Sequence, residues 1–264
     1  MAGSLKGPLD KFWRAEAQLD ELREEIERAF PDEKRWPVRS EIDGTGREYR
    51  FYIAEMPRVG AHWPLAVGEI LFNFRASLDH LVYELHVRRF KGKVPRKVEG
   101  TSQFPIYTSI GEFNRCRYRI KCLSQRDRRA LGYLQPYETG CDKWQPVRYA
   151  LRRLNTLHNI DKHRQLHLVA AANYIQLMPE FKFGPLYGLH AKSHPGAVEP
   201  HSPVETWTWA VAPPPRKVAL HPGVMLEVAI QDRGKLGEPV LLSLTQISIG
   251  VRQVLDRFAN RFER

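Results

Sequence analysis

Apolar residues recur at spacings of three and four along several stretches of this chain, and this spacing is typical of amphipathic helices. The pattern predicts helices over residues 9–30, 65–89, 124–134, 146–162 and 240–262. In residues 65–89 the apolar side chains form one continuous stripe, made of Val67, Ile70, Leu71, Phe74, Leu78, Leu81, Val82 and Leu85. We expect this helix to be buried along most of its length.

Short alternating or apolar runs follow residue 163, and an earlier run covers residues 47–56. They predict further strands over residues 167–172, 174–183, 206–211 and 225–230, whereas the Pro- and Gly-punctuated residues 92–102 predict a loop. We therefore expect an α+β fold, a helical bundle with a small antiparallel β-sheet inserted before the C-terminal helix. As one domain it divides into an N-terminal helix and strand (1–60), a helical core (61–164), a β-rich insertion (165–238) and a C-terminal helix (239–264).

The charge of the chain is unevenly distributed. Its 264 residues contain 41 Lys and Arg against 30 Asp and Glu, a net charge of +11, and residues 85–135 hold 13 basic residues against three acidic ones. Aromatic residues lie between these basic residues, and this combination suits a nucleic-acid backbone and its bases. The candidate RNA-binding residues are Arg88, Arg89, Arg115, Arg117, Arg119, Lys121, Arg128 and Arg129. The alternatives are a solvated surface or a docking surface for an acidic protein partner.

Several function classes lack their sequence signals. No apolar stretch approaches the roughly 20 residues of a membrane span, and no hydrophobic signal region follows the N-terminus, so we expect a cytoplasmic protein without a membrane partner. Three cysteines without a close pair fit a reducing compartment and do not indicate structural zinc. Gly-rich phosphate loops and a G-x-S-x-G elbow are missing, so neither a nucleotide cofactor nor ordinary serine hydrolysis is indicated.

Two of the predicted helices carry polar residues that a purely structural core does not need. In residues 65–89, Arg75 and Asp79 are four apart and can pair, while helical geometry places His158 and Asp161 on the apolar face of residues 146–162. If these helices lie side by side, they gather a polar pocket from Asn73, Arg75, Asp79, His80, Asn155, His158, Asp161, His163 and Arg164. Such a group is either a satisfied hydrogen-bond network or an acid–base site. In both cases Asp161→Ala is expected to cost roughly 2–4 kcal/mol of stability, because it would strand buried donors.

A metal site is a further interpretation of the same residues. His158 and Asp161 are three apart, and Asp79 and His80 could add ligands, which would suit a metal-dependent small-molecule hydrolase. The chain lacks an HExxH or ExxH pair, however, and Lys162 places a cation beside the group. We therefore expect neither a metal nor another cofactor.

Both polar helices resemble those of a group of bacterial, often actinobacterial, proteins of unknown function. The motifs are N-x-R-x-x-L-D-H-L, starting at Asn73, and N-x-x-x-N-I-D-K-H-R, starting at Asn155. The resemblance covers about residues 68–164 and implies no particular activity.

The stretch from Arg153 to His158 resembles the arginine–histidine motif of HEPN helical-bundle ribonucleases. This resemblance implies a HEPN-like bundle, a homodimer that forms one metal-independent site, and a role in toxin or phage-defence systems. Arg153 and His158 would promote attack of the ribose 2′-hydroxyl on the adjacent phosphate, and we count Asn155 and Asp161 with them as candidate catalytic residues. The leading hypothesis is therefore an RNA-binding endoribonuclease or an inactive relative, and the alternative is a non-catalytic interaction protein.

Overall fold

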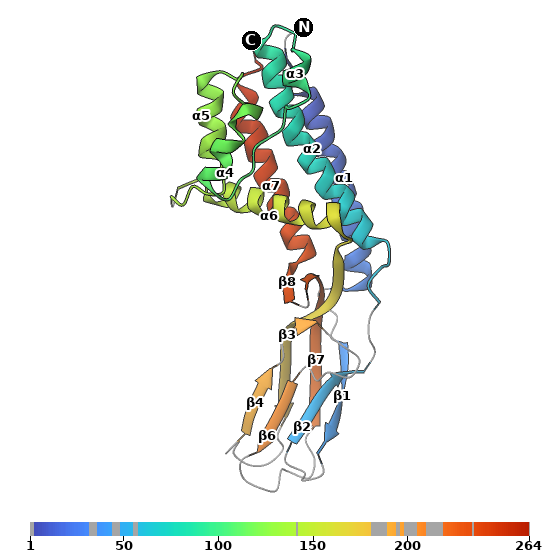
Figure 1. The fold of residues 1–264 in the computed structure, drawn as a ribbon. Helices are drawn as coiled ribbons and strands as arrows, with labels where there is room; N and C mark the ends of the chain where they lie inside the picture. The colour runs from blue at the N-terminus through green and yellow to red at the C-terminus, as the bar shows by residue number, and fades with distance from the viewer. Residues whose placement is uncertain are drawn as a thin grey trace. The chain divides into compact units, whose positions relative to one another are not determined.

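The computed structural model describes residues 3–31, 36–43, 48–54, 58–140, 142–180, 189–193, 196–197, 205–209, 219–233 and 235–263. The chain forms two compact units, whose helices and strands are labelled in Figure 1. One comprises Met1–Leu22, Pro64–Leu166 and Leu241–Arg264 and is called here the helical unit. The other comprises Arg23–Trp63 and His167–Val240 and is called the sheet unit. The expected α+β class is confirmed.

The long helices begin and end within a few residues of their predicted positions. They are α1 (Lys6–Ala29), which continues into the second unit, α2 (Trp63–Arg89), α5 (Gln125–Tyr133), α6 (Gln145–His163) and α7 (Val240–Ala259). Between α2 and α5 lie the short helices α3 (Arg96–Glu99) and α4 (Ile110–Arg115) and the 3-10 turn η1 (Arg117–Arg119), so the expected loop at residues 92–102 contains one helical turn. In the described part of the chain, no helix has the length and apolar character needed to cross a membrane.

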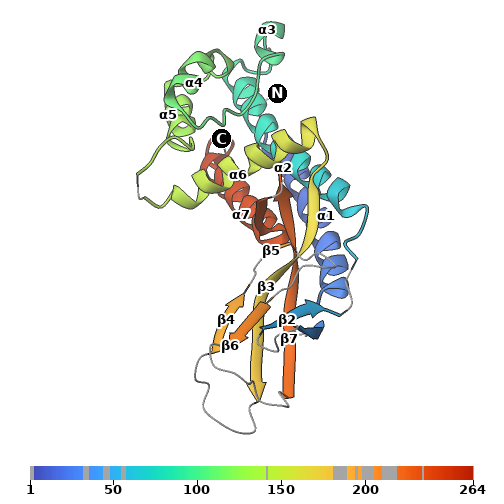
Figure 2. The ribbon, with the colours of Figure 1, turned by 60° about the horizontal axis from the view of Figure 1, so that its bottom comes forward.

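The apolar stripes of the helices form the core of the helical unit. Phe12 of α1 packs on Phe74 of α2 with ring centroids 5.8 Å apart, and both side chains are buried. Figures 1 and 2 show α1 running alongside α2, and the hydroxyl of Ser77 on α2 donates to the Pro8 carbonyl of α1 at 2.8 Å. Helices α6 and α7 approach closely at Gly250, where an added Cβ would collide with the Cβ of Ala150.

The sheet unit is antiparallel and has the strand order β4-β6-β2-β1-β7-β3-β5, with β8 paired to β7. Its strands are β1 (Trp36–Ile42), β2 (Glu48–Ile53), β3 (His167–Glu180), β4 (Leu189–Ser193), β5 (Gly196–Ala197), β6 (Glu205–Trp209), β7 (Ala219–Asp232) and β8 (Lys235–Pro239). The long β3–β7 pair is visible in Figure 2.

The sheet contains more of the chain than the sequence pattern predicts. Strand β1 was not expected, and the hairpin of β1 and β2 pairs with β7 and β6, so the N-terminal strands join those that follow α6 in one sheet. The expected strands 174–183 and 206–211 extend into residues outside the described ranges.

Candidate functional site

A buried ion pair on α2 forms one wall of the candidate site. Arg75 Nη2 lies 3.2 Å from Asp79 Oδ1, and Arg75 Nε donates to Asp79 Oδ2 at 3.3 Å. Arg75 Nη2 also donates to the Phe104 carbonyl oxygen at 2.7 Å, and the Phe104 N–H donates to Asp79 Oδ1 at 2.8 Å. The pair expected from the four-residue spacing therefore also holds the segment around Phe104 onto α2.

This segment is fixed from its other side by the buried side chain of Gln135. Gln135 Nε2 donates to the Pro105 carbonyl oxygen at 2.8 Å, and Gln135 Oε1 accepts from the Tyr107 N–H at 3.1 Å. Gln103, at the start of the segment, accepts a hydrogen bond from Arg119 of η1. Residues 103–107 are thus held by α2, by η1 and by the end of α5, so their backbone and side chains are preorganised.

Helix α6 meets α2 where Asp161 faces Gly68. A Cβ on Gly68 would lie 2.6 Å from an Asp161 carboxylate oxygen, so the two helices approach closely here and a larger residue would displace the Asp161 side chain. The expected contact between these two helices is therefore confirmed. The expected burial of Asp161 is wrong: the residue is half-buried, and it accepts no hydrogen bond within the described residues. Since Asp161 lies two residues before the end of α6, the apolar face of the helix is already open to solvent there.

A cavity of about 470 Å³ lies between α2, α6 and the segment that joins α3 to η1. Its lining is rich in polar and charged side chains: Arg75, Gln103, Phe104, Ile106, Tyr107, Thr108, Glu112, Arg119, Asn155, His158, Asn159 and Lys162. Three of these residues are basic, namely Arg75, Arg119 and Lys162, and Glu112 is the one acidic residue among them. Asn155, His158 and Lys162 are three and four apart on α6, so they present one face of the helix to the cavity.

Burial is the main influence on the ionisable groups here. It lowers the pKa of His158, and the nearby Arg75 guanidinium lowers it further, although Asp79 and Asp161 raise it. Burial also raises the pKa of Asp79, against the opposing effects of Arg75 and of the Phe104 N–H. A lowered histidine pKa keeps the imidazole neutral near pH 7, and a neutral imidazole can accept a proton.

The cavity also contains a phenol that keeps its proton. Burial and the neighbouring Cys116 raise the pKa of Tyr107 to about 12. Tyr107 therefore faces the cavity as a neutral group at physiological pH.

Arg153 points to a different neighbour from His158. It donates to the Ser243 hydroxyl of α7 at 3.3 Å and lies outside the cavity lining. His158 instead faces the ion pair of α2. The two residues of the expected arginine–histidine motif thus share a helix but not a cavity.

The other expected pocket residues also lie outside the cavity lining. Asn73 donates to Gln18 of α1 at 2.8 Å, on the α1 side of α2. His80 is exposed on α2, and His163 and Arg164 are exposed at the end of α6. Of the expected set, the lining therefore contains Arg75, Asn155 and His158, with Asp79 directly behind Arg75.

Sequence reasoning missed several groups of the cavity. Gln103, Tyr107, Glu112 and Lys162 were not expected in the site, and Arg119 was expected as an RNA-binding residue outside this pocket. The sequence did contain one signal for these groups. The Phe-Pro-Ile run that starts at Phe104 is buried, and polar residues that flank a buried run, such as Gln103, lie beside the core.

In the described ranges, no group of three or more His, Cys, Asp or Glu side chains is arranged to hold a metal ion. Asp79, His158 and Asp161 influence one another electrostatically without forming such a group. These residues therefore supply no metal-ligand set for a metal-dependent hydrolase.

A cationic surface adjoins η1. Arg117, Arg128 and Arg129 line a second cavity of about 330 Å³, and Arg128 donates to the Lys121 carbonyl oxygen at 3.3 Å. The name basic surface is used here for five residues: Arg117, Arg119, Lys121, Arg128 and Arg129. Within the described residues none of these five side chains forms an ion pair.

The acidic residue nearest to the basic surface in sequence does not neutralise it. Asp127 of α5 is buried, accepts from Ser124 at the start of the helix and pairs with Arg261 at 3.1 Å. The negative charge of Asp127 is therefore paired with Arg261 and does not offset the basic surface. Of the remaining strip residues, Arg88 and Arg89 are exposed at the end of α2, and Arg115 is exposed at the end of α4.

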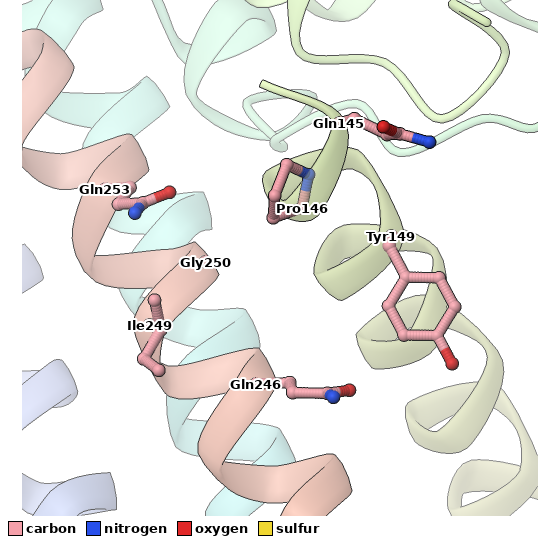
Figure 3. Close-up of a pocket in the computed structure, with 7 residues that line it drawn as sticks. All are labelled: Gln145, Pro146, Tyr149, Gln246, Ile249, Gly250 and Gln253. Atoms are coloured by element: carbon pink, nitrogen blue, oxygen red, sulfur yellow. The ribbon is translucent and has the colours of Figure 1, made fainter. Parts of the chain in front are cut away.

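A third hollow, of about 350 Å³, lies between α6 and α7 and carries no charged side chain (Figure 3). It is lined by Gln145, Pro146, Tyr149, Gln246, Ile249, Gly250 and Gln253. Unlike the cavity at Arg75, it contains no cation and no histidine, and Tyr149 is the one titratable residue of its lining.

Comparison with protein-family models, with curated proteins and with solved structures gives no match to this chain. The two family resemblances expected from the motifs stay predictions.

Proposed function

We propose that this protein binds single-stranded RNA through the basic surface of its helical unit. The observation that carries the proposal is the set of five cations on η1, α5 and the turn between them, which form no ion pair in the described part of the chain. Such cations bind phosphates and release the counterions that surround a nucleic acid.

Exposed aromatic rings favour RNA over an acidic protein as the partner. Tyr118 of η1 and Tyr133 of α5 are 49% and 59% exposed and lie in the same segments as the arginines. Bases of a single strand can stack on such rings, whereas an acidic peptide needs only the charges.

The test is a binding titration of a fluorescent single-stranded RNA against salt concentration. Replacing Arg117, Arg128 and Arg129 together by Gln should weaken binding about tenfold or more, and should reduce the slope of log K against log salt by about two. The control replaces Lys6, Lys11 and Arg14 of α1 by Gln, which removes the same charge elsewhere and should change little. Absence of binding at low salt, equal losses in both triple variants, or stronger competition by a polyglutamate than by unlabelled RNA would overturn the proposal.

A second candidate function is metal-independent cleavage of the bound RNA, with His158 as the base. It is supported by a histidine of lowered pKa that lines a cavity with three cations. His158 would take the proton of a ribose 2′-hydroxyl, whose oxygen forms a bond to phosphorus as the bond to the 5′-oxygen breaks. The proton would then pass to the leaving 5′-oxygen, so the products are a 2′,3′-cyclic phosphate and a 5′-hydroxyl.

The cleavage proposal retains the HEPN-like interpretation for His158 but not for its pairing with Arg153, which contacts α7. Wild-type protein should generate cyclic phosphate ends in the presence of EDTA, and His158→Gln should abolish this product while RNA binding is retained, because the basic surface is unaltered. Cleavage that continues in the His158→Gln variant, or that stops with EDTA, would overturn this second proposal.

A further inference from the structure

Arg75 combines burial, fixed geometry and an unused donor. The residue is 7% exposed, and two of its three guanidinium nitrogens are held by Asp79 and by the Phe104 carbonyl. Its third nitrogen, Nη1, is buried and has no hydrogen-bond partner among the described residues. Buried donors are almost always paired, so a guanidinium that lines a cavity with one amine unused is an incomplete arrangement.

We infer that the cavity is a phosphate-binding site anchored by Arg75, and that it takes one phosphate of an RNA strand lying on the basic surface. The unused amine of a guanidinium can donate a directional, charge-assisted hydrogen bond to a phosphate oxygen, and a side chain already fixed in place loses little freedom on binding. The inference rests on the proposed RNA binding for the source of the phosphate, but the site itself is argued from the cavity alone.

Two further cations surround the same space. Arg119 is held at its edge by Gln103, and its guanidinium lies 5.8 Å from the centre of the Tyr118 ring. Lys162 enters from α6 and adds a third basic side chain, and the three basic residues face the carboxylates of Glu112, in the lining, and Asp79, paired with Arg75. The resulting excess of positive charge favours an anion over a neutral ligand.

The size and the neutral groups of the cavity also fit a phosphate ester. Its volume of about 470 Å³ lies in the range of small-molecule sites and exceeds the needs of a lone inorganic anion. Asn155, Asn159 and Thr108 supply neutral donors around the cations, and such donors can bind the ribose hydroxyls beside a phosphate.

The position of η1 connects this cavity to the basic surface. Arg119 lines the cavity at Arg75, and Arg117, two residues earlier in the same 3-10 turn, lines the second cavity with Arg128 and Arg129. One turn of backbone thus contributes a cation to each hollow. This continuity favours a polymeric source of the phosphate over a free small ester.

The experiment measures the binding of inorganic phosphate, of uridine 3′-monophosphate and of a single-stranded RNA by calorimetry. Arg75→Lys should weaken both small ligands about tenfold or more, because a lysine has a single nitrogen and cannot hold Asp79 and the Phe104 carbonyl while keeping a further amine fixed for the ligand. Arg153→Lys is the control. Arg153 is a half-buried arginine of the same unit that lies outside the cavity, so this variant should change the affinity for neither inorganic phosphate nor uridine 3′-monophosphate. Arg119→Gln and Lys162→Gln, which leave the buried ion pair intact, should each weaken the small ligands several-fold and carry the test if Arg75→Lys does not fold.

The outcomes separate this inference from the proposed function. If the wild type binds RNA but neither small ligand, or if Arg153→Lys weakens them as much as Arg75→Lys does, the phosphate site is refuted while RNA binding stands. If the small ligands bind through Arg75 and RNA does not bind, the proposed function fails, and so does the RNA source of the phosphate. The inference is supported when the cavity variants weaken all three ligands and the variant of Arg117, Arg128 and Arg129 weakens RNA alone.

Discussion

The described helices contain two Arg–Asp pairs with the same four-residue spacing, and they differ mainly in burial. In the pair of α2, the side chains of Arg75 and Asp79 are 9% and 27% exposed. In the pair of α7, those of Arg252 and Asp256 are 41% and 57% exposed, with an N–O distance of 3.0 Å. Replacing each aspartate by alanine therefore tests how much the buried pair contributes to the helical unit.

We expect Asp79→Ala to lower the free energy of unfolding by about 2–3 kcal/mol. Breaking a buried pair by removing one partner costs roughly 3–5 kcal/mol, and the partial exposure of Asp79 reduces this figure. Part of the loss is the hydrogen bond from the Phe104 N–H to the carboxylate. Asp79→Asn should cost less, because the amide oxygen can still accept that bond and because burial already disfavours the charged carboxylate. Asp256→Ala should cost about 0.3–0.5 kcal/mol, the usual value for an exposed pair on a helix.

Urea denaturation followed by circular dichroism at the helical band measures all three values. The buried-pair account requires the order Asp79→Ala, then Asp79→Asn, then Asp256→Ala, from most to least destabilising. It would be refuted if Asp79→Ala and Asp256→Ala had equal effects. Equal effects would mean that Arg75 regains water when its partner is removed and that the segment around Phe104 is held by other contacts.

Three further predictions test the packing and the titrating groups. Gly250→Ala should destabilise the protein by about 1–3 kcal/mol despite the better helix propensity of alanine, because the new Cβ collides with α6. Gly111→Ala is the control: its Cβ meets open space, so it should be neutral or slightly stabilising in the same urea assay. Burial lowers the pKa of His86 from its usual 6.5, so on acidification the unfolded chain takes up a proton before the folded protein does, and stability falls as the pH drops below about 6.5. His86→Gln should therefore make the melting temperature less sensitive to pH below 6.5. An unchanged dependence of the melting temperature on pH would contradict this prediction. Asp161→Ala should cost less than about 1 kcal/mol, since no donor is stranded, and a larger loss in thermal melts would show that Asp161 holds α6 at Gly68.

Local patterns were sufficient to predict the helices of the candidate site. The apolar stripe of α2 and the polar residues at its edge gave the Arg75–Asp79 pair, and the spacing on α6 placed His158 on the side that faces it. These inferences succeeded because they depend on helical periodicity alone. The prediction that Asp161 is buried was wrong, because the helical periodicity continues to the end of α6 whereas the core does not extend that far.

The remaining parts of the site depend on contacts that periodicity does not encode. The Phe104 carbonyl and N–H that complete the ion pair are backbone groups, which any residue other than proline would supply. Arg119 enters the cavity because a 3-10 turn and a hydrogen bond to Gln103 place it there. The joining of β1 to β7 likewise depends on pairing between strands far apart in the sequence.

The central claim is that RNA lies on the basic surface and reaches the cavity at Arg75. Photocrosslinking of the full chain to a single-stranded RNA containing 4-thiouridine, followed by mass spectrometry of the peptides, tests it most directly. The account predicts crosslinks in residues 103–133 and in α6 near His158, reduced by unlabelled RNA and by the Gln variant of Arg117, Arg128 and Arg129. Crosslinks confined to the sheet unit, or none at low salt, would contradict it.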